Sequence, residues 1–194
     1  LCLALLAGVL GMIAGLLVAD PLLRLIDTPS SIFHLASVYL KLYFLGYPFL
    51  LIYDFGSAIL RSHGDSRSPF LILLAAGVVN VVLNLVFVIL FHMDVAGVAI
   101  ATDIATALSA VFVVYRLAGE EGPFRFRMGR LTLHGPSVSR ILTIGIPAAL
   151  QGAVFCLANI FVQAAVNTFG TTVVAGNTIA LNYEYFTYYL ITAF

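Results

Sequence analysis

The chain alternates long apolar runs with short polar links. A helix needs about 20 apolar residues to cross a hydrocarbon core roughly 30 Å thick. Runs of about this length or longer lie at 1–19, 32–60, 69–91, 95–117, 138–168 and 171–194. Because lipid offers no hydrogen-bond partner to open backbone groups, the pattern predicts six transmembrane helices in an all-α polytopic bundle. The pair Asp20-Pro21 is predicted to close the first helix.

Composition supports a membrane protein and excludes several other classes. Of the 194 residues, 62% are hydrophobic and 9% are charged, whereas a soluble domain has about 25% charged residues. The formal net charge of zero provides no basic face for a nucleic-acid partner. The cysteines, Cys2 and Cys156, lie in apolar runs, which excludes a disulfide scaffold and a cysteine-based zinc site. Both ends of the chain fall inside apolar runs, so we expect an internal segment of a longer protein.

Positive charges predict how the chain is oriented in the membrane. Most basic residues lie in or beside the links 61–68 and 118–137. They are Arg61, Arg67, Arg116, Arg125, Arg127, Arg130 and Arg140. Only Arg24 and Lys41 belong to the opposite side. The positive-inside rule therefore places these two links in the cytoplasm, in a multi-pass protein of the plasma membrane.

Polar side chains inside the predicted spans are the candidate functional groups. Asn80 and Asn84 are four residues apart and therefore share one helix face. The other candidates are Asp54, Thr102, Gln151, Asn159, Gln163, Asn177 and Glu184. An amide or hydroxyl in a span can also simply join helices, whereas a carboxylate near the midplane indicates a cavity or a partner. Asp103 is expected closer to the outer surface.

Proline positions and the absence of catalytic patterns narrow the function. Pro48 and Pro147 lie within predicted spans, where they kink helices and favour a protein that moves. No Gly-x-Ser-x-Gly, His-Glu-x-x-His or Walker lysine motif occurs, and the histidines lack metal-ligand spacing. We therefore expect no catalytic residue, no metal site, no cofactor and no enzymatic activity.

Several strings resemble the multidrug and toxic compound extrusion (MATE) family. They are LRSHGDSRSP at 60–69, NVVLN at 80–84, VAGVAIAT at 95–102, GIP at 145–147 and VAGN at 174–177. Their order and spacing are similar to those of helices three to eight of the family's twelve. The resemblance implies two six-helix lobes related by a pseudo-twofold axis. Residues 1–117 would be the last four helices of the first lobe, 118–137 the cytoplasmic linker, and 138–194 the first two helices of the second lobe.

The resemblance also implies a function and a cation site. The expected activity is antiport, in which H⁺ or Na⁺ enters while an organic, often cationic, compound leaves, and the expected transporter is a monomer in the bilayer. By position, Asn80, Asn84 and Thr102 would bind the coupling cation. An aspartate is usual in the family where this chain has Asn84. Asp54, Gln151, Asn159, Gln163, Asn177 and Glu184 would serve substrate binding or coupling.

A lipid-linked oligosaccharide flippase of the same superfamily is the alternative. Such a carrier lines its cavity with Arg and Lys to hold a pyrophosphate group. Lys41 is the only such residue away from the ends of a predicted span. The sequence therefore favours export of organic compounds over lipid flipping.

Overall fold

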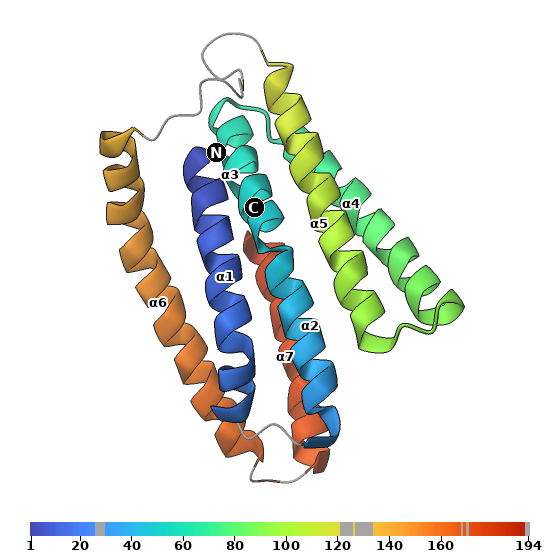
Figure 1. Ribbon diagram of the computed structural model, residues 1–194. Coiled ribbons are helices and arrows are strands. Elements are labelled where there is room, and N and C mark those ends of the chain that lie inside the picture. The colour runs from blue at the N-terminus through green and yellow to red at the C-terminus, as the bar shows by residue number, and fades with distance from the viewer. Residues whose placement is uncertain (26–29, 121–125, 127–133, 168, 170, 193–194) are drawn as a thin grey trace. The chain divides into compact units, whose positions relative to one another are not determined.

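The computed structural model describes residues 1–25, 30–120, 126, 134–167, 169 and 171–192, and these residues form helices joined by short connections (Figure 1). No strand occurs among them, which confirms the all-α class. The helices are α1 (Cys2–Leu25), α2 (Ser30–Leu45), α3 (Tyr47–Ser62), α4 (Arg67–Leu85), the π-helical turn η1 (Val86–Leu90), α5 (Asp94–Ala118), α6 (Gly135–Asn167) and α7 (Thr171–Thr192).

The chain forms two compact units, Leu1–Leu133 and His134–Phe194. In the first unit, α5 packs against α2, α3 and α4, while α1 packs against α2 and α3. In the second unit, α6 and α7 pack against each other. The boundary between the units falls within residues 118–137, of which 121–125 and 127–133 lie outside the described residues.

Most of the described helices are long and apolar enough to cross a membrane. Four qualify by length and composition, in α1, in α4 continued through η1, in α5 and in α6, and the bent pair α2–α3 qualifies when its two helices are taken together. Helix α7 has 22 residues but is not among them. Asn177, Asn182 and Glu184, together with its tyrosines, lower its hydropathy. The sixth span therefore stays a prediction.

Two helix boundaries differ from the expected ones. Pro21 lies inside α1, which continues to Leu25, so the expected end at Asp20-Pro21 is wrong. The proline removes one backbone donor, and the turn before it is held by contacts of Asp20 with α2. The run 32–60 is not one straight helix, because it breaks at Gly46 and bends by 40°. Pro48 in the first turn of α3 agrees with the kink expected there.

Glycines allow α1 to approach the bent pair closely. A Cβ on Gly8 would lie 2.7 Å from Cα of Pro48, and one on Gly11 would overlap the ring of Tyr47. One on Gly15 would overlap the ring of Phe44. Glycine is therefore required at these positions by the packing, as in other closely packed membrane helices.

The link after α3 is tied to the end of α5. The backbone N–H of Ser68 donates to Asp65 at 2.9 Å, and the guanidinium of Arg116 lies 3.4 Å from the same carboxylate. Arg116 also pairs with Glu120 at 2.8 Å. Hydrogen bonds from Ser68 and the nearby charge of Arg116 hold the pKa of Asp65 below its usual range. Exposed ion pairs contribute only about 0–1 kcal/mol, so the network mainly positions the link.

The exposed position of Ser66 in this link provides a test of orientation. With Cys2 and Cys156 replaced by serine, a Ser66→Cys protein should react with a membrane-impermeant maleimide only after the cells are opened, because the positive-inside rule places the link in the cytoplasm. Mass-tag gel shifts measure the reaction. Labelling of intact cells would reverse the predicted orientation.

Candidate functional site

Three predicted cation-site residues, Asn80, Asn84 and Thr102, form a hydrogen-bonded chain between α4 and α5. The amide N–H of Asn84 donates to the side-chain oxygen of Asn80 at 3.0 Å, and the amide N–H of Asn80 donates to the hydroxyl of Thr102 at 3.3 Å. Thr102 in turn donates to the Val98 carbonyl at 2.9 Å. Each side chain donates to the next one, so this series of hydrogen bonds fixes the orientation of both amide groups.

At the start of this series of hydrogen bonds, the side-chain oxygen of Asn84 is buried and has no hydrogen-bond partner among the described residues. An unsatisfied buried oxygen costs about 1–3 kcal/mol. Amide oxygens are suitable ligands for hard cations such as Na⁺, and they also accept a hydrogen bond from a protonated carboxyl group. The arrangement therefore presents an open acceptor where the resemblance places the cation.

A second group of polar side chains lines a groove between α6 and α7 within the second unit. The groove has a volume of about 780 Å³. Its lining includes Gln151 from α6 and Glu184, Tyr185, Tyr188 and Tyr189 from α7. The rings of Tyr188 and Tyr189 meet edge to face with centroids 5.8 Å apart. Glu184 is exposed and forms no ion pair among the described residues.

The structure does not bring every predicted residue to these two places. Asn159, Gln163 and Asn177 lie on α6 and α7 but do not line the groove beside Glu184. Asp54 is exposed on α3 and forms no ion pair within the described part of the chain. Of the predicted site residues on α6, Gln151 is the one that lines this groove.

Sequence reasoning missed an ion pair between α1 and α2. The ammonium of Lys41 lies 2.6 Å from Asp20, and the hydroxyl of Ser37 donates to the other oxygen of that carboxylate at 2.5 Å. Ser37 and Lys41 are four residues apart and so share a helix face. That spacing is the available signal, whereas the proline after Asp20 indicates a helix end.

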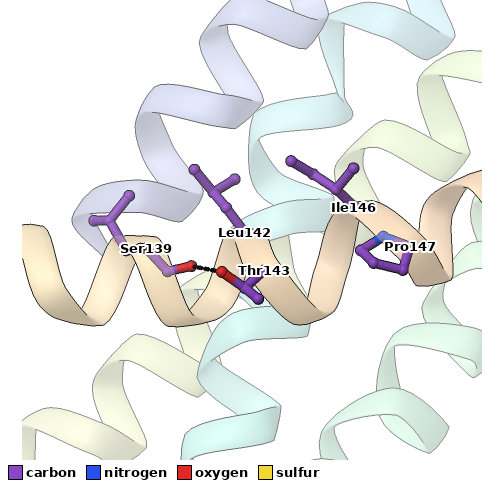
Figure 2. Close-up of a pocket in the computed structure, with 6 residues that line it drawn as sticks. Ser139, Leu142, Thr143, Ile146 and Pro147 are labelled. Carbon is purple, nitrogen blue, oxygen red and sulfur yellow. Dashed lines mark hydrogen bonds between the residues drawn. The ribbon is translucent and has the colours of Figure 1, made fainter.

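The residues that line a further hollow, on α6, include no charged or amide side chain. It is lined by Leu142, Ile146 and Pro147, together with neighbouring residues of the same helix (Figure 2). The hydroxyl of Thr143 donates to the carbonyl of Ser139 at 2.8 Å, drawn as a dashed line in Figure 2. No predicted site residue lines this hollow. Across the described residues, no three His, Cys, Asp or Glu side chains come together as metal ligands.

Comparison with known proteins identifies similar sequences and folds. The family model MatE matches residues 1–86. The chain is 35% identical over 165 residues to the "Probable multidrug resistance protein YpnP" of Bacillus subtilis (strain 168), covering 84% of this chain. It is 29% identical over 178 residues to the "Probable multidrug resistance protein YoeA" of the same organism, covering 88% of this chain.

A solved structure has a similar fold. It is a MATE protein in the bent conformation, with a TM-score of 0.80 and 25% identity over 93% of this chain. The chain spans 36% of the length of YpnP, 38% of YoeA and 41% of the solved chain.

Proposed function

We propose that this chain, which belongs to the MATE family, forms part of a secondary transporter that exports organic, often cationic, compounds in exchange for H⁺ or Na⁺. Members of this family are transporters and not enzymes. Two relatives are named as probable multidrug resistance proteins, which supports small organic molecules as substrates. The membrane-length helices agree with a multi-pass protein of the plasma membrane.

The groove of Glu184 and the tyrosines is the observation that carries this proposal. A carboxylate attracts cationic compounds, and aromatic faces hold a cationic group or a flat ring. About 780 Å³ is within the range of pockets that hold small organic ligands. Gln151 on the facing helix supplies a hydrogen-bonding group. These features together fit an amphiphilic cation.

The amide chain of Asn80, Asn84 and Thr102 supports the ion-coupled half of the exchange. The open oxygen of Asn84 suits a small cation, or a protonated carboxyl group brought by another part of the protein. Because an amide does not take up a proton near neutral pH, Asn84 would bind the cation without titrating.

The flippase alternative gains no support from the side chains. A pyrophosphate head group needs cations that are free to contact it. Lys41, the only Lys or Arg well inside a predicted span, is held at 2.6 Å by Asp20. Its charge is therefore already balanced within the first unit.

Transport by the purified protein tests the proposed function. The full-length protein, reconstituted in vesicles, should move a fluorescent cationic dye against its gradient when an opposing H⁺ or Na⁺ gradient is imposed. Separate pH and Na⁺ gradients identify the coupling ion. Failure to move the dye under either gradient would contradict cation-coupled export of such compounds.

Replacement of Asn80 separates cation binding from helix packing. Asn80→Leu removes both hydrogen bonds of the amide and should greatly reduce dye export, while the amount of protein in the membrane stays nearly unchanged, because interhelical hydrogen bonds contribute only about 0.6 kcal/mol. Transport per folded molecule is the measurement. Equal losses of export and of folded protein would instead show that Asn80 only joins α4 to α5.

A further inference from the structure

We propose that Asp103, together with the break between α2 and α3, forms a binding site for a small monovalent cation, H⁺ or Na⁺. This site is distinct from the amide chain of Asn80 and Asn84. The inference rests on the proposed function, since an ion-coupled exporter needs groups that bind and release the coupling ion. It assigns one such group to a residue that the sequence pattern alone placed near the outer surface.

The carboxylate of Asp103 lies against the backbone of the helix break. Asp103 is nine residues after Asp94, hence about 14 Å along α5. A Cβ added to Gly46 would overlap this carboxylate and lie 2.8 Å from its carbon. Only glycine at this position leaves space for the carboxylate beside the bend.

Asp103 is half-buried and forms no hydrogen bond or ion pair within the described part of the chain. A charged carboxylate within a span costs several kcal/mol unless a partner offsets its charge. The ion pairs among the described residues use Asp20, Asp65 and Glu120 instead. A cation from solution would supply the missing partner.

The break adds a neutral oxygen to the carboxylate. Pro48 has no N–H, so it cannot donate to the carbonyl of Phe44 as an α-helix would require. Carbonyls released where a membrane helix is broken are ligands for Na⁺ or H⁺ in transporters. The bend of 40° and Pro48 therefore place a backbone acceptor on the same break as Asp103.

Charged and titratable groups on the helices that pack against α5 are engaged elsewhere. On α2, Lys41 pairs with Asp20, and the rings of Tyr39 and Tyr43 stack on each other with centroids 6.4 Å apart. On α3, Tyr47 packs against Gly11, Tyr53 donates to the Pro69 carbonyl at 3.1 Å, and Asp54 is exposed. The remaining groups are farther along their helices, about 18 Å or more from this level for His34 on α2, Arg61 on α3 and Arg67 on α4.

Cation binding at Asp103 would act on the bend itself. The carboxylate lies against Gly46, where α2 ends and α3 begins. A bound cation changes the charge at this point and so changes the relative stability of bent and straighter forms of α2–α3. Consecutive helical residues point about 100° apart, so Thr102 contacts Asn80 on α4 while Asp103 meets Gly46.

Direct binding measurements on the full-length protein test this site. Two quantities are measured in detergent for the wild type and for Asp103→Asn. They are the number of radioactive Na⁺ ions bound per molecule and the number of protons taken up per molecule between pH 8 and pH 5. For a Na⁺ site, bound Na⁺ should fall by one ion per molecule, and for a proton site, proton uptake should fall by one. Asp94→Asn, the same change at the exposed start of α5, is the control and should alter neither number. If Asp103→Asn matches the wild type in both, the site is refuted.

A chemical measurement covers the case in which Asp103→Asn does not fold. Dicyclohexylcarbodiimide, an apolar reagent for protonated carboxyl groups, should modify Asp103 in the wild-type protein, and Na⁺ or raised pH should protect it. Peptide mass spectrometry locates the adduct. A carboxyl that is never modified, or that neither condition protects, refutes the site. Loss of cation binding in Asp103→Asn together with a wild type that exports no dye would refute the proposed function and leave the site standing.

Discussion

Glu184→Gln should abolish most export of a cationic dye while leaving the amount of folded protein unchanged. The substitution keeps the shape and hydrogen-bonding capacity of the side chain but removes the charge that would attract a cation to the groove. Because Glu184 is exposed and forms no ion pair within the described residues, its loss should cost little stability. Dye export from vesicles, measured across a range of pH, is the test.

Two companion variants sharpen this test. Glu184→Asp retains the charge and should keep part of the export, whereas Glu120→Gln removes a carboxylate that pairs with Arg116 at the end of α5 and should have little effect on transport. A Glu184→Gln protein that exports dye at the wild-type rate with the wild-type pH dependence would remove Glu184 from both substrate binding and coupling.

The second large effect concerns the ion pair between α1 and α2. Asp20→Asn should lower the free energy of unfolding because it leaves the ammonium of Lys41 without its anionic partner. The loss should be smaller than for a fully buried pair, since both side chains are 40% exposed. Thermal unfolding in detergent measures the change.

The double variant Asp20→Asn/Lys41→Met distinguishes this pairing from general sensitivity of the region. Removing both charges should restore most of the stability lost in Asp20→Asn, because no uncompensated charge then remains. If the double variant loses the sum of the two single effects, the residues are not coupled, and the contact of 2.6 Å contributes nothing specific.

The apolar runs were sufficient to predict a helical chain, because lipid restricts a spanning backbone to very few forms, but the run 32–60 forms two helices, α2 and α3. The contact between Asn80 and Asn84 also follows from local spacing, since residues four apart meet on a helix. The contacts of Asp20 could not be predicted in this way. Its partners Ser37 and Lys41 lie on another helix, and nothing in the local pattern of residues 1–25 indicates them.

Asp103 and Gly46 illustrate the same limit in the candidate sites. The sequence indicated a kink near Pro48, but the contact between Gly46 and Asp103 depends on how α5 lies along the bent pair. That register is set by tertiary packing. An example is the contact of Gly56 with Val113, which lies ten residues further along both α3 and α5. The groove of Glu184 likewise depends on the pairing of α6 with α7.

The glycine positions of α1 determine what kind of motion the first unit can make. Phe44, Tyr47 and Pro48 each rest on a glycine of α1, and these glycines repeat at intervals of three and four residues, about one helical turn, along one face of that helix. Packed interfaces of this kind change between discrete arrangements and do not deform gradually. We therefore expect the bent pair to move past α1 in steps of about one helical turn, roughly 5.4 Å, so that the first unit behaves as a ratchet with a few defined stops.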